Sequence, residues 1–170
     1  MAEDDVQSPE RGEPTVSQNI PGRVAGIDFG TVRIGIAVSD PERRIASPYE
    51  NYTRRGEKQD AKRFLQLVEE EAIRLFVVGL PVHLDGRESE KSQEARRFGQ
   101  WLAEITSVPV QFFDERFTSH QAEEALLAAQ MTKKRRKRRL DMLAAQIMLS
   151  AYLESGGEDP EPPQALDDEP

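Results

Sequence analysis

The run "LFVVGLPV" at positions 75–82 constrains the fold more than any other feature of the sequence. A strand with one solvent-exposed face alternates apolar and polar side chains, whereas a strand that is covered on both faces does not. No polar side chain interrupts this run. We therefore predict a fully buried strand with other elements packed on both sides of it.

Helix and strand patterns alternate around that run. Helical spacing of apolar residues at 57–72 and 88–105 brackets the buried strand, and "VPVQFFDER" follows as another strand. Before them we expect an antiparallel meander of strands at 24–29, 34–39 and 46–53, with Pro48 favouring an edge position for the third. The order predicts an α/β fold, in which a five-stranded mixed sheet combines the antiparallel meander with two parallel strands and has helices on both faces.

Two further helices are expected near the end of the chain. Thr118 and Gln121 form a capping box for a helix that reaches about residue 130, and a last helix follows the basic run at 133–139. The apolar stripes predict which helix faces are buried. In the helix at 57–72 they are Ala61, Phe64, Leu65, Val68 and Ala72, and in the last helix Leu140, Leu143, Ala144, Ile147, Met148 and Ala151.

The net charge of −8 is unevenly distributed. Residues 1–20 contain five acidic and one basic residue, and residues 154–170 contain seven acidic and no basic residues, which leaves the rest mildly basic. Such acidic, weakly apolar ends lack the residues needed to offset the entropy of ordering. We therefore predict one folded domain at 22–154 between disordered acidic segments at 1–21 and 155–170.

Several protein classes are excluded by composition. The chain has no cysteine, so it contains no disulfide, thiolate zinc site or cysteine nucleophile. Its acidic start lacks the pattern of a signal peptide, and its apolar runs are too short to cross a bilayer. We expect a soluble cytoplasmic protein that does not associate with membranes.

Acidic residues recur where predicted elements end or begin. Asp28 ends the first strand, Asp114 and Glu115 end the last one, and Asp141 lies in the first turn of the last helix. Each has a structural explanation: Asp28 could bind turn amides, Asp114 or Glu115 could pair with Arg116, and Asp141 could favour a helix N-terminus. However, the carboxyl ends of parallel strands meet at one edge of a sheet, so these acids can also gather at one point.

Gathered carboxylates repel one another and raise each other's pKa unless divalent cations neutralise them. A ligand set made only of oxygen atoms suits Mg²⁺, or alternatively Mn²⁺, rather than zinc. The sequence therefore makes a magnesium site an alternative to three separate structural acids.

The run "KKRRKRR" places seven positive charges directly before the final acid. It is either a solvated linker or a surface for a polyanion, and the mutual repulsion of its charges favours the polyanion. No aromatic residues interleave the run, so we expect contact with the nucleic-acid backbone rather than base stacking. The predicted nucleic-acid-binding residues are Arg33, Arg116, Lys133, Lys134, Arg135, Arg136, Lys137, Arg138 and Arg139.

Four motifs in order give the chain a family resemblance. They are "GIDFGTVRIGIAVSD", "VVGLPVHLDG", "VPVQFFDERFTS" and "KKRRKRRLDMLAAQIMLSAYLE". Over about residues 23–154 the chain resembles the YqgF family, nucleases of pre-16S rRNA that are also described as Holliday-junction-resolvase-like and have an RNase H-type fold.

The resemblance implies a magnesium-dependent nuclease that processes the 5′ end of pre-16S rRNA in a bacterial cytoplasm. It carries the family's three catalytic, metal-binding acids onto Asp28, Glu115 and Asp141. Asp114 is adjacent to Glu115, but strand alternation directs its side chain to the opposite face. Phe117 departs from the family pattern, which commonly has leucine there.

Three other functions stay open from the sequence. The stretch "DFGT" also resembles the phosphate-binding hairpin of actin-like and Hsp70-like ATPases, although this chain is too short for their second lobe. Cleavage of a four-way DNA junction would use the same acids, since backbone contacts do not report the sugar. A non-catalytic RNA- or ribosome-binding factor would need the basic run but not the three acids. The oligomeric state is open as well.

Overall fold

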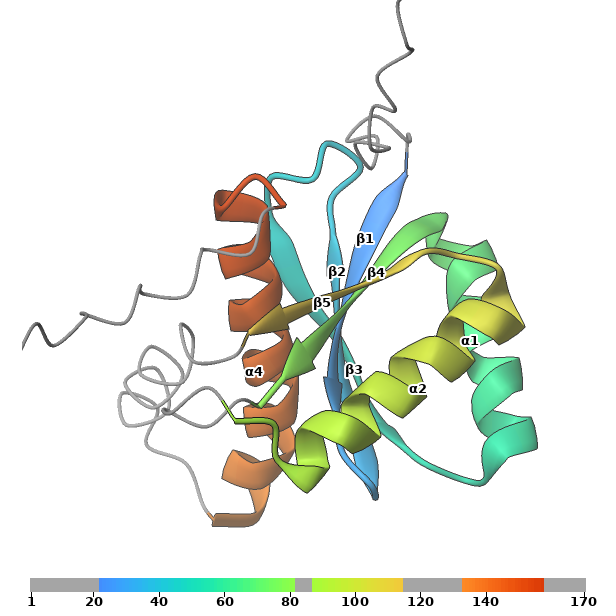
Figure 1. The fold of residues 1–170 in the computed structure, drawn as a ribbon. Helices are drawn as coiled ribbons and strands as arrows, with labels where there is room; N and C mark the ends of the chain where they lie inside the picture. Colours follow the sequence, from blue (N-terminus) through green and yellow to red (C-terminus); the bar gives the residue numbers. More distant parts are fainter. Residues whose placement is uncertain (1–21, 82–86, 115–132, 158–170) are drawn as a thin grey trace, which may run out of the picture.

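A five-stranded mixed sheet with helices on both faces forms the framework of the protein (Figure 1). The structure, a computed structural model, describes residues 22–81, 87–114 and 133–157. The strands are β1 (Arg23–Phe29), β2 (Arg33–Ser39), β3 (Ala46–Thr53), β4 (Ile73–Leu80) and β5 (Val110–Asp114). The helices are α1 (Glu57–Glu71), α2 (Glu90–Thr106) and α4 (Lys133–Glu154).

The strands lie in the order β3-β2-β1-β4-β5, with β1 at the centre. β1 pairs antiparallel with β2 and parallel with β4, and β4 pairs parallel with β5. The predicted meander and the two parallel strands are therefore confirmed, as is the edge position of the strand that contains Pro48. Because β1, β4 and β5 are parallel, their carboxyl ends lie at the same edge of the sheet.

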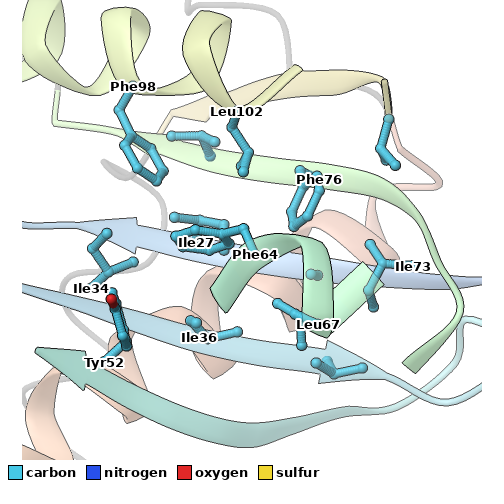
Figure 2. Close-up of a cluster of buried hydrophobic side chains, with 14 of the residues drawn as sticks. Ile27, Ile34, Ile36, Tyr52, Phe64, Leu67, Ile73, Phe76, Phe98 and Leu102 are labelled. Carbon is cyan, nitrogen blue, oxygen red and sulfur yellow. The ribbon is translucent and has the colours of Figure 1, made fainter. Parts of the chain in front are cut away.

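Each face of the sheet has its own apolar layer. One layer joins alternate residues of β1, such as Ala25 and Ile27, to α1 and α2. Figure 2 shows its centre, formed by Ile27, Ile34, Ile36, Tyr52, Phe64, Leu67, Ile73, Phe76, Phe98 and Leu102. The other layer joins Val24, Leu75, Val77 and Phe113 to α4. The run at 75–80 supplies side chains to both layers, which confirms its prediction as a buried strand.

The buried face of α1 differs from the predicted one. Phe64 is buried as expected, but Leu65 is 47% exposed, and the other buried residues of the helix are Asp60 and Leu67. The helix turns this face inward because buried Asp60 finds partners there: its carboxylate accepts a hydrogen bond from the hydroxyl of Tyr52 at 2.8 Å. An acid with such a partner can occupy a core position that hydrophobic spacing would not assign to it.

The last helix begins earlier than predicted. α4 starts at Lys133, so the basic run is helical rather than a linker, and position 141 falls in the third turn instead of the first. The predicted place of Asp141 in the first turn is therefore wrong, and the alternative that it favours a helix N-terminus falls with it. The buried face of α4 contains Ala145, Met148, Leu149 and Tyr152, of which the predicted stripe included Met148.

Some predicted segments lie outside the described residues: the helix that begins at Thr118, and the acidic segments at 1–21 and 158–170. The start of the predicted C-terminal segment, residues 155–157, forms a turn after α4. Among the helices that the structure describes, none combines the length and the apolar character needed to span a bilayer.

Candidate active site

Asp28 lies near the carboxyl end of the central strand, on the face that α4 covers. Side chains alternate along β1, and Val24 belongs to the α4 layer, whereas Ala25 and Ile27 belong to the opposite layer. Asp28 therefore shares the face of Val24 and Gly26. Asp28 is partly exposed.

Gly26 allows α4 to approach β1 closely. A Cβ atom at this position would lie 2.8 Å from the Cβ of Leu149 and 3.2 Å from the carbonyl oxygen of Ala145. Any side chain here would push against the backbone of the helix, so only glycine fits without a shift. The helix is thus seated against β1 two residues before Asp28.

The hairpin after Asp28 holds its backbone in place. Asp28 pairs with Gly35 of β2, so the cross-strand neighbour on the same face contributes no side chain. At the turn, a Cβ atom on Gly30 would lie 2.4 Å from the carbonyl oxygen of Arg33, which requires glycine. The carboxylate of Asp28 therefore projects from a paired strand beside a neighbour with no side chain.

The carboxyl end of β5 lies at the same edge of the sheet. Leu80, the last residue of β4, pairs with Asp114, the last residue of β5. Asp114 is partly exposed. The predicted ligand Glu115 follows it directly, but Glu115 and Arg116 lie outside the described residues.

The other predicted site residues lie on α4 and β2. Position 141 is one helical turn before Ala145, although the side chain of Asp141 is not among those described. Within the basic run the described side chains are those of Arg135 and Arg139, which are exposed and four residues apart on one side of the helix. Arg33 is the first residue of β2 and is partly buried.

A metal site cannot be assembled from the described residues alone. Among them, no three histidine, cysteine, aspartate or glutamate side chains are close enough to hold an ion. Two of the three predicted ligands, Glu115 and the side chain of Asp141, are not in that set.

A pocket of about 380 Å³ opens on the α1 and α2 side of the same strand end. Its lining includes Phe29, Thr31, Arg54, Glu94, Arg97 and Trp101. The motifs of the sequence do not predict a site at these residues. Their signal is weak, because they come from three separate segments and only Phe29 and Thr31 lie near a predicted acid.

Comparison with known proteins agrees with this fold. The family profile described as "RuvX: Holliday junction resolvase" matches residues 22–155. A protein of Rhodopirellula baltica named "Putative pre-16S rRNA nuclease" is 46% identical over 134 residues, which cover 79% of this chain and 78% of the relative. A protein of the same name from Koribacter versatilis is 40% identical over 142 residues, covering 84% and 93%.

A solved structure shares the architecture. RuvC of T. thermophilus in complex with a Holliday junction substrate aligns with a TM-score of 0.52 over 82% of this chain and 99% of RuvC. The sequences are 19% identical, so this likeness establishes the fold, which is the RNase H-like fold that the family resemblance implied. The family match and the identity to its members establish the rest: the chain belongs to the RuvX family of nucleases, also called YqgF.

Proposed function

We propose that this protein is a divalent-metal-dependent nuclease that hydrolyses phosphodiester bonds of pre-16S rRNA, at its 5′ end, in the cytoplasm. The observation that carries the proposal is the close approach of α4 to β1 at Gly26. It supports a shared site for acids that are more than one hundred residues apart in the chain.

The direction of α4 brings position 141 toward Asp28. Figure 1 shows α4 running antiparallel to β1, and Tyr152, late in the helix, packs in one cluster with Val24, early in the strand. From Ala145 back to position 141 is about 6 Å along a helix, and from Gly26 on to Asp28 is about 7 Å along a strand. Position 141 and Asp28 therefore lie at similar distances from the contact at Gly26, in the same direction along the strand.

Glu115 would approach the shared site from the β5 side of the sheet. β5 is two strands from β1, a separation of about 10 Å across a sheet, and its carboxyl end faces the same edge. Glu115 is the first residue after that strand. Its long side chain and that of Asp28 can span much of this distance toward a common cation.

The donor set fits a hard divalent cation. Asp28, Glu115 and Asp141 would supply carboxylate oxygens, the ligands that Mg²⁺ and Mn²⁺ prefer. Such a cation lowers the pKa of bound water and offsets charge that develops on a phosphate. The protein itself would hold Asp28 on a paired strand and Asp141 on a helix, so that both are oriented before the substrate arrives.

The basic run would bring the substrate to these acids. Because it forms the first two turns of α4, its charges and position 141 belong to one rigid helix. We propose that Lys133, Lys134, Arg135, Arg136, Lys137, Arg138 and Arg139, together with Arg33 and Arg116, bind backbone phosphates. Such contacts position a strand without reading its sequence.

The test is cleavage of two labelled substrates, a pre-16S rRNA fragment and a four-way DNA junction, each with Mg²⁺ or with a chelator. We expect the RNA to be cut only when Mg²⁺ is present, and the junction to stay intact. Cleavage of the junction but not of the RNA would show that the substrate is DNA. Junction cleavage is the reaction that the name of the family profile describes. Binding of RNA without cleavage under all conditions would overturn the nuclease proposal.

A further inference from the structure

The pocket beside β1 lies next to Asp28 but on the other face of the sheet. Phe29 follows Asp28 in the strand, so their Cα atoms are about 3.8 Å apart while their side chains point to opposite faces. Phe29 lines the pocket, and Thr31 of the hairpin turn also borders it. A strand of nucleic acid that passes Asp28 at this edge therefore runs close to residues that line the pocket.

The pocket has an aromatic wall. The rings of Phe29 and Phe98 stack with their centroids 4.7 Å apart, and the ring of Trp101 lies 5.4 Å from that of Phe98. Phe98 is buried, whereas Phe29 and Trp101 are partly exposed to the pocket side of the helix layer. Partly exposed aromatic surface in a nucleic-acid-binding protein is suited to stacking with unpaired bases.

A fixed arginine forms a second wall. The guanidinium of Arg54 lies 5.4 Å from the centroid of the Phe29 ring, and its Nε donates a hydrogen bond of 3.1 Å to Asp60. Asp60 is fully buried and also accepts hydrogen bonds from the hydroxyl of Tyr52 and the backbone N–H of Arg55. Arg54 is therefore oriented before any ligand binds.

Asp60 keeps the negative charge that anchors this arginine. Burial alone would raise its pKa, but the N–H of Arg55, the hydroxyl of Tyr52 and the side chain of Arg54 together hold the pKa of Asp60 below its usual value. Burial of Tyr52, together with its hydrogen bond to this carboxylate, raises the pKa of Tyr52 to about 12, so the hydroxyl stays a donor.

The charges that line the pocket are balanced. Arg54 and Arg97 contribute two cations, and Glu57 and Glu94 contribute two carboxylates. With its cations balanced by carboxylates, the pocket offers a phosphate no net attraction. A nucleobase is neutral, presents both donors and acceptors on its edge, and has a face that stacks on rings and guanidinium planes.

We propose that this pocket binds one unpaired nucleobase of the RNA strand adjacent to the phosphodiester at Asp28. The inference rests on the proposed function, since it assumes that a strand crosses this edge of the sheet. The volume of about 380 Å³ suits a single nucleoside-sized group. The contacts to the base are stacking on the partly exposed ring of Trp101, donation from the arginines, and acceptance by the glutamates.

Trp101 provides the readout, because it is the only tryptophan of the chain. The full-length protein, kept in chelator to prevent cleavage, is titrated with a six-nucleotide single-stranded RNA while tryptophan fluorescence is recorded. We expect saturable quenching. An abasic strand of the same length, which has the phosphates but no bases, should bind without quenching. Equal quenching by the abasic strand would overturn the proposal.

A pair of arginine variants tests the location. Arg97→Ala should raise the Kd from the quenching titration about tenfold, the size of effect expected when one contact to a stacked base is lost. Arg74→Ala, an exposed residue at the amino end of β4, removes the same charge at the opposite edge of the sheet and should leave the Kd unchanged. Equal effects of the two variants would indicate general electrostatics and contradict a base pocket.

The two proposals fail in different ways. Metal-dependent RNA cleavage without base-dependent quenching would leave the nuclease proposal intact and overturn the pocket. The opposite result is base-dependent quenching that Arg97→Ala weakens, in a protein that never cleaves RNA. It would support the base pocket and overturn the nuclease proposal.

Discussion

Asp28→Asn is expected to lower the rate of metal-dependent RNA cleavage by about 1,000-fold or more, while RNA binding changes little. Catalytic groups that act as a unit lose most of their effect when one member is removed. The amide of asparagine keeps the shape of the side chain but not the charge that a divalent cation requires. The measurement is single-turnover cleavage of the labelled pre-16S rRNA fragment, with binding followed separately in chelator.

Asp40→Asn is the matched control. Asp40 follows β2, and one of its carboxylate oxygens accepts hydrogen bonds from the backbone N–H groups of Arg44 and Ile45 at 2.7 and 2.8 Å. An asparagine oxygen can accept both bonds, so this variant changes the same charge without disturbing the fold. Its cleavage rate should match that of the wild type. If Asp28→Asn cleaved as fast as this control, Asp28 would have no catalytic role.

Gly26→Ala is expected to lower the free energy of unfolding by about 1–3 kcal/mol and the cleavage rate by about 10- to 100-fold. The new methyl group would meet the Cβ of Leu149 at 2.8 Å and the backbone of Ala145 at 3.2 Å, so α4 must move away from β1. A movement of about 1 Å at a site can cost this much rate. Stability is measured by denaturant unfolding and activity by the same cleavage assay.

Gly99→Ala separates the displacement of α4 from a general loss of stability. A Cβ atom at Gly99 would lie 2.6 Å from the ring of Phe112, which places the clash between α2 and β5. This variant should also be less stable, but its cleavage rate at a temperature where it is folded should stay near that of the wild type. Equal losses of activity in both glycine variants would contradict the importance of the contact between α4 and β1.

The sheet could be predicted because its signals are local. The uninterrupted apolar run at 75–80 indicates that its strand is buried. The proline at position 48 indicates that its strand lies at the edge of the sheet. The alternation of side chains in β1 likewise separates Asp28 from Phe29 without any knowledge of the tertiary structure.

The helix faces were harder to predict because distant residues determine them. Asp60 is buried in α1 because of Tyr52 and Arg54, and Leu149 is buried in α4 because Gly26 leaves room for it. None of these three partners can be inferred from the periodicity of the helix itself. The start of α4 was misplaced because its first turns lack apolar residues, although lysine and arginine are good helix formers.

Only part of the candidate site could be predicted from the sequence. The position of Asp28 at a strand end followed from local pattern, but its helix neighbour depends on the packing at Gly26. The pocket at Trp101 could not be predicted, since its arginine is oriented by a buried carboxylate and its walls come from separate segments.

Binding of Mn²⁺, measured by electron paramagnetic resonance on the full-length protein, tests most directly whether three carboxylates share a cation. We expect saturable binding that Asp28→Asn, Glu115→Gln and Asp141→Asn each weaken by at least about tenfold, whereas Asp40→Asn leaves it unchanged. Binding that survives undiminished in any one of the first three variants would contradict a common site.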